Sequence, residues 1–325
     1  MSDLPPDDVP PADLARVRTR PIDGREHLVD RAAFARPVGP DETIGAFLDA
    51  LPRLLAADAL RELADAIAIA RANGARVLFG LGGHVIKVGL GPLLADMVEA
   101  GLVTDLAVNG SAVIHDLEIA RIGRTSERVA ETITDGRFGM IEETAAAFAR
   151  IFARGAEVGL GRAVAEELDQ GPYPYREDAL TLRAARAGAT ITVHVAVGTD
   201  TVHAVPGADG AAIGAATHLD FRRLCSVVSW LGEGVFVNVG SAVVLPEVFL
   251  KAVSVARNLG ATIEGVTAAN LDMVQHYRPR VNVCERPVAR GITLTGHHEL
   301  LVPLLRVEAL RRLAEHGGPQ TPRRG

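Results

Sequence analysis

Residues 77–120 read VLFGLGGHVIKVGLGPLLADMVEAGLVTDLAVNGSAVIHDLEIA, and this stretch decides the fold. It holds an apolar strand, a glycine-rich turn, a helix, and a second apolar strand that ends at Asn109-Gly110-Ser111. That order is typical of the βαβ unit of dinucleotide-binding folds. Ligands of open α/β sheets bind at the carboxyl ends of strands, and both ends here carry small residues. The stretch therefore predicts one half of a ligand site.

The same pattern returns in the second half of the chain. An apolar strand over 234–239 runs into Gly240-Ser241-Ala242, and a helix follows over 246–259. The first strand of the opening stretch is predicted at 76–80. We predict further strands at 190–197 and 261–267, and further helices at 60–72, 139–153, 162–168 and 300–314. This alternation predicts an α/β fold with a doubly wound, mostly parallel sheet and additional N-terminal helices. We expect an arm over 1–40, a single domain over 41–316 and a tail over 317–325.

Composition limits the classes of partner. The chain has 325 residues and a net charge of -6, which disfavours nucleic acid and anionic membranes as partners. No run approaches the ~20 apolar residues that a membrane-spanning helix needs. The acidic, proline-rich start does not resemble a secretory signal, and two cysteines give no disulfide framework. We therefore expect a cytoplasmic protein.

The glycine-rich turn matches the dinucleotide fingerprint only in part. Gly80-Leu81-Gly82-Gly83-His84-Val85 has valine where the fingerprint has its third glycine. The fingerprint also expects an acid near the end of the next strand, where Asn109 stands, while Asp105 lies at the start of that strand. The sequence thus disfavours an ordinary Rossmann nicotinamide site, and a plain tight turn explains the glycines equally well.

Histidines and carboxylates gather beyond the predicted strand ends. They are His194, Asp200, His203, Asp272, His276, His297 and His298. Such residues can ligate a divalent metal, although a single histidine is more often a hydrogen-bonded or surface residue. At the helix start after Asn109, Asp116 and Glu118 suit a ligand site or simply complement the helix dipole.

Taken together, these segments resemble the deoxyhypusine synthase family over most of residues 75–310. The matching segments, in chain order, are 82–84, 108–112, 196–200, 240–247 and 302–305. In the family they correspond to a Thr-Ser-Asn turn, Thr-Thr-Ala-Gly-Gly, Ala-Leu-Thr-Asp, Gly-Gly-Gly-Val-Val-Lys-His-His and Phe-Pro-Leu-Leu. The resemblance implies a Rossmann-like fold, NAD bound at strand ends, and a homotetramer with sites across subunit contacts.

The chain departs from the family at two functional positions. Leu245 replaces the lysine on which family enzymes carry an aminobutyl group as an imine, and an alkyl side chain forms no imine. Gln275-His276-Tyr277-Arg278-Pro279 replaces the acidic segment that helps to hold the polyamine. The resemblance thus implies the fold and NAD, with altered transferase- or oxidoreductase-type chemistry on a C–N bond.

Three hypotheses follow. The first is an NAD-using enzyme acting on a small amine or amino-acid-like substrate, with His or Asp as proton carriers. The second is a metal-dependent enzyme with a His/Asp cluster, and the third is a ligand-binding protein without turnover. The predicted catalytic residues are His194, Asp200, His203 and His297. The predicted cofactor-binding residues are Gly82, Gly83, His84, Asn109, Gly110, Ser111, Gly240, Ser241 and Ala242. The predicted substrate-binding residues are Lys87, His115, Asp116, His276 and Arg278.

Overall fold

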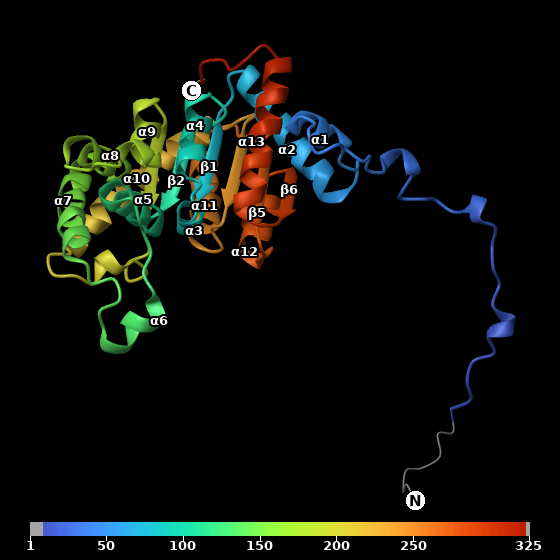
Figure 1. The fold of residues 1–325 in the computed structure, drawn as a ribbon, viewed down its shortest axis with the longest axis horizontal. Helices are drawn as coiled ribbons and strands as arrows, with labels where there is room; N and C mark the ends of the chain where they lie inside the picture. The colour runs from blue at the N-terminus through green and yellow to red at the C-terminus, as the bar shows by residue number, and fades with distance from the viewer. Residues whose placement is uncertain (1–8, 323–325) are drawn as a thin grey trace, which may run out of the picture.

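A six-stranded sheet in which every neighbouring pair is parallel forms the centre of the molecule (Figure 1). The computed structural model describes residues 9–322. The strands are β1 Val77–Leu81, β2 Asp105–Asn109, β3 Thr190–His194, β4 Val235–Val239, β5 Thr267–Asp272 and β6 Arg290–Thr295. Their order is β3-β2-β1-β4-β5-β6, so the direction of winding reverses between β1 and β4. This is the Rossmann strand order, and it confirms the predicted fold class.

Helices cover both faces of the sheet. They are α1 Ile44–Ala50, α2 Leu55–Ala72, α3 Gly83–Lys87, α4 Gly91–Glu99, α5 Gly110–Ile122, α6 Val129–Thr132, α7 Glu142–Val158, α8 Leu160–Gln170, α9 Leu180–Arg186, α10 Gly210–Ser229, α11 Val244–Asn258, α12 Tyr277–Pro279 and α13 His298–Glu315. The two faces of β1 show the arrangement. Phe79 packs in one core with α2, α4 and α13, and Leu78 packs in the other with α10 and α11. Double coverage explains why the central strands are continuous apolar runs.

The order of elements follows the sequence pattern, with exceptions at the last two strands, β5 and β6. The predicted helices at 246–259 and 300–314 are confirmed as α11 and α13. The predicted strand at 261–267 is wrong, because β5 begins only at Thr267. The sequence pattern also missed β6, an edge strand that alternates exposed and buried residues. One face of an edge strand meets solvent, so the apolar run that marks a central strand is lacking.

Residues 9–40 run away from the sheet in Figure 1. They contain three short 3-10 helices and are almost entirely exposed. Residues 1–8 of the predicted arm, and 323–325 of the predicted tail, lie outside the described residues. Within 9–322, no helix has the length and apolarity to cross a membrane.

Candidate functional site

The loops after β1 and β4 touch at two glycines. The backbone N–H of Gly82 donates to the carbonyl of Val239 at 3.0 Å. A Cβ on Gly82 would lie 2.0 Å from the carbonyl oxygen of Gly240, which itself has a φ of +65°. Backbone contact thus requires glycine at the first position, and a left-handed conformation favours it at the second. The place between the ends of β1 and β4, where the direction of winding of the sheet reverses, is therefore lined by backbone atoms.

A histidine pair lies beside this point. The ring of His298 packs edge-to-face against that of His84, with centroids 5.5 Å apart. His298 Nε2 lies 3.2 Å from the carbonyl of Leu271 and 3.8 Å from Asp272 Oδ1. Burial lowers the pKa of His298, and the negative charge of Asp272 opposes this effect only in part. His298 is therefore a neutral, buried donor, whereas the predicted His297 beside it is exposed.

A cavity of about 580 Å³ opens on the other side of β1, between α5, the segment 123–144 and the loop 199–201. That volume lies within the range of small-molecule sites. The cavity brings together four of the predicted residues from the ends of three strands. They are Lys87 after β1, Ser111 and His115 after β2, and Asp200 after β3.

The cavity wall carries charges of both signs. Lys87, Arg121 and Arg124 line it and make no hydrogen bond or ion pair with any residue in 9–322. Glu143 likewise has no partner among these residues, whereas Glu127 accepts a hydrogen bond from the Gly139 N–H at 2.7 Å. Unpaired charges of both signs suit a ligand that itself carries both.

A short polar chain connects His115 to Glu118. His115 Nδ1 lies 2.7 Å from the hydroxyl oxygen of Thr125, and that hydroxyl donates to Glu118 at 2.5 Å. Thr144 also donates to Glu118, at 3.4 Å. Burial alone would raise the pKa of Glu118, but the nearby His115, whose Nδ1 lies 3.9 Å from Glu118 Oε2, and the hydrogen bond from Thr125 outweigh it and lower that pKa. Thr125 is not among the residues predicted from the sequence, and the alternative role predicted for Glu118 was to complement the helix dipole.

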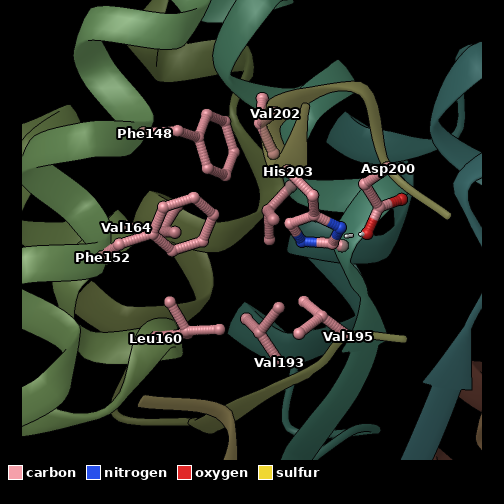
Figure 2. A pocket seen from close by; sticks show the side chains of 11 residues that line it. Phe148, Phe152, Leu160, Val164, Val193, Val195, Asp200, Val202 and His203 are labelled. Carbon is pink, nitrogen blue, oxygen red and sulfur yellow. Dashed lines mark ion pairs between the residues drawn. The ribbon is translucent and has the colours of Figure 1, made fainter. Parts of the chain in front are cut away.

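Asp200 lies at the floor of the cavity and also lines a much smaller apolar space of about 10 Å³, which His203 lines as well (Figure 2). His203 Nδ1 accepts a hydrogen bond from the Gly198 N–H, so the proton of the neutral ring is on Nε2. This Nε2 lies 3.9 Å from Asp200 and has no hydrogen-bond partner among the described residues. Burial raises the pKa of Asp200, and the nearby His203 and His115 oppose that shift.

The other two predicted catalytic residues lie away from this cavity. His194 is fully buried, lies 2.9 Å from the Thr192 hydroxyl, and has its pKa lowered by burial to about 3. His297 lies at the exposed start of α13. No group of three or more His, Cys, Asp or Glu that could hold a metal ion occurs within residues 9–322. The predicted metal site therefore has no structural support.

Several predicted binding residues have a structural role in the fold. The Asp116 carboxylate accepts hydrogen bonds from the backbone N–H groups of Leu180 and Thr181, and so caps α9. Burial raises the pKa of Asp116, although these bonds favour its charged form. The Asn109 side chain caps α5, and the Ser241 hydroxyl accepts a bond from the Leu245 N–H. Capping with Asn, Asp or Ser is usual at helix starts.

The remaining predicted residues lie near the end of β5 or on the loop after β4. His276 and Arg278 are exposed there, and Arg278 lies 3.3 Å from Glu247. Ala242 is half-buried in the loop after β4. These residues line a different part of the sheet's edge from the cavity beside α5.

Comparison with known proteins supports the fold. No family model and no curated protein matches the sequence. A solved structure of AgrE in ternary complex with ornithine and NAD+ has a TM-score of 0.51 to this chain at 13% identity. The match covers 79% of this chain and 33% of the AgrE chain, so this chain spans about a third of the length of AgrE. A "putative deoxyhypusine synthase" from Entamoeba histolytica has a TM-score of 0.48 at 11% identity, covering 83% of this chain and 94% of that one.

Proposed function

We propose that the protein binds NAD and acts on a small amine or amino-acid-like substrate, without forming a lysine imine. The observation that carries this proposal is the cavity of about 580 Å³, whose unpaired charges of both signs lie at the carboxyl edge of a sheet with Rossmann strand order. Such edges are where α/β folds bind nucleotides and substrates. The AgrE structure with the same fold contains ornithine and NAD+.

Three strand ends offer places for the cofactor. The residues that would hold NAD are Gly82, Gly83, His84, Asn109, Gly110, Ser111, Gly240, Ser241 and Ala242. They follow β1, β2 and β4, which are neighbours in the sheet. Lys87 lies one turn after the first of these loops and is free to pair with a phosphate. NAD+ would supply a hydride acceptor for a carbon that bears nitrogen.

The charges of the cavity favour a zwitterionic substrate. Arg121 and Arg124 make no hydrogen bond or ion pair within residues 9–322 and can bind a carboxylate, although the charge of Arg121 also acts on Glu167. Glu143 can bind an ammonium group. Arginine suits a carboxylate particularly well because its guanidinium binds both oxygens at once. A polyamine such as spermidine has no carboxylate to place against the two arginines, so we favour amino acids over polyamines.

The position of the family's lysine supports a reaction without a covalent imine. Leu245 is 1% exposed and packs in the core between the sheet and α11. Lys251 pairs with Glu247 on the same helix. Lys87 is the one remaining lysine in the sequence, and it lies at the wall of the cavity.

The proposal is tested by incubating the protein with NAD+ and a panel of L-amino acids and diamines. We expect NADH to form with at least one amino acid, together with a product that has lost two hydrogens or, after hydrolysis, ammonia. Native mass spectrometry of the same mixtures reports whether NAD+ is bound. Bound NAD+ without turnover would favour the alternative of a ligand-binding protein, and absence of both would overturn the proposal.

A further inference from the structure

We propose that His115 accepts the proton that the substrate nitrogen releases, and that Thr125 and Glu118 are its positioning residues. This inference rests on the proposed function and adds to it the residue that moves the proton. It stands on the direction of two hydrogen bonds, on the position of His115 in the cavity wall, and on the shape of the turn that brings Thr125 to it.

The hydrogen-bond directions fix the tautomer of His115. A threonine hydroxyl has a single proton, and that of Thr125 is donated to Glu118 at 2.5 Å. His115 Nδ1, 2.7 Å from the same oxygen, must therefore be the donor in their contact. The neutral ring then has its lone pair on Nε2. Nε2 has no hydrogen-bond partner among residues 9–322, and the ring lines the cavity.

The local backbone is arranged to make this contact. His115 and Glu118 are three residues apart on α5 and so share one face of the helix. Gly123 ends the helix in the left-handed conformation, with a φ of +67°, and the chain turns back so that Thr125 reaches both side chains. Ser126, next to Thr125, has a φ of +68°, which is costly for a residue other than glycine. Such strain persists only where surrounding contacts enforce it.

Charged groups surround the ring of His115. Glu118 is ionised at neutral pH because its hydrogen bonds lower its pKa, so it stabilises the imidazolium that forms. His115 is close enough to Asp200 to oppose the rise that burial causes in the pKa of Asp200. The remaining charged groups of the cavity wall are Lys87, Arg121, Arg124, Glu127 and Glu143.

The proposed step is a two-electron oxidation of the substrate's C–N bond. The substrate nitrogen loses a proton to His115 Nε2 while its electron pair forms the second bond of C=N. The carbon bonded to this nitrogen would give up a hydride, with its electron pair, to NAD+, the oxidant that the proposed function supplies. Because the substrate nitrogen starts as an ammonium group, the products are a protonated imine, NADH and protonated His115, which returns the proton to solvent through the cavity.

The tautomer can be measured without any ligand. Nitrogen-15 NMR of the free protein should show the His115 proton on Nδ1, whereas free neutral imidazole side chains prefer Nε2–H. Thr125→Val should shift the proton to Nε2, and Glu118→Gln should do so in part. Nε2–H in the wild type would overturn the inference whether or not the protein binds NAD. This measurement therefore separates failure of the inference about His115 from failure of the proposed function.

A kinetic comparison tests the catalytic role itself. His115→Gln should lower the rate of NADH formation by about 100-fold or more, as is usual for loss of a general base, and leave NAD+ affinity within threefold. Thr125→Val should lower the rate less and shift its pH profile. The exposed His218→Gln, on α10, is the control and should have no effect. An unchanged rate in His115→Gln would overturn the inference.

Discussion

The carboxylate of Asp200 lies in the space that a side chain at Gly110 would need. A Cβ on Gly110 would come within 2.1 Å of Asp200 Oδ2 and 3.1 Å of a methyl group of Val195. The glycine in the Asn109-Gly110-Ser111 junction is therefore explained by a contact within the protein. A larger residue there would displace Asp200 from the floor of the cavity.

This contact predicts a clear difference between two matched glycines. Gly110→Ala should destabilise the protein by about 1–3 kcal/mol, as overpacking does. Gly210→Ala is the control, because Gly210 also follows a capping residue at a helix start and has no atom near its missing Cβ. It should be neutral or slightly stabilising. Urea unfolding measures both, and equal effects would contradict the packing of Asp200 against Gly110.

Buried His194 predicts a loss of stability in mild acid. Its pKa is about 3 in the folded protein, against 6.5 for an ordinary histidine. A group whose pKa is lower in the folded protein than in the unfolded chain takes up its proton first in the unfolded chain. The contribution of His194 to stability is therefore fully present above pH 6.5 and is lost as the pH falls toward 3. Between pH 7 and pH 5 this one group should cost about 2 kcal/mol.

His194→Gln should remove that part of the pH dependence, since glutamine can keep the bond to Thr192 and does not titrate. The measurement is urea unfolding of wild type and variant at pH 7 and pH 5. Exposed His218→Gln serves as the control and should keep the wild-type pH dependence. The prediction fails if wild type and His194→Gln lose the same stability between the two pH values.

We predict an assembly larger than a monomer, most simply the tetramer that the resemblance implies. The arm exposes large apolar side chains, among them Val17, Ile22, Leu28 and Phe34, each at least 59% exposed. Contact with another subunit would bury them. Sedimentation velocity should show a tetramer for the whole chain and a smaller species after removal of residues 1–40. A monomeric whole chain at micromolar concentration would exclude this assembly.

No substrate imine should form at the position of the family's lysine. Borohydride treatment with NAD+ and spermidine, followed by peptide mass spectrometry, should find no adduct at Leu245, because its alkyl side chain is buried and unreactive. The same treatment is applied to Lys251→Ala and to Lys87→Arg, which replace the two lysines of the sequence one at a time. An adduct at Lys87 would show that the nucleophile has moved, and it would restore aminobutyl transfer as the leading hypothesis.

The sequence predicted the sheet and its ligand-facing edge because both depend on local patterns. The strand ends at Gly82, Asn109 and Gly240 were recognisable from apolar runs that stop at small residues. Thr125 was not predictable, since the segment after α5 has no periodicity and its partner His115 is ten residues away. The capping role of Asp116 was not predictable for a similar reason, because the N–H groups from which it accepts hydrogen bonds are 64 and 65 residues away in the sequence. His297 and His298 are adjacent in the sequence, and the helix geometry at the start of α13 buries His298 and exposes His297.

Calorimetric titration with NAD+ measures whether the protein binds the cofactor. We expect one cofactor per chain with a dissociation constant of about 1 mM or tighter. Lys87→Ala should weaken binding about tenfold, because Lys87 is an unpaired cation free to meet a phosphate, and Lys251→Ala should leave it unchanged. Absence of binding by the wild type at millimolar NAD+ and NADH would contradict the proposal that the protein binds NAD.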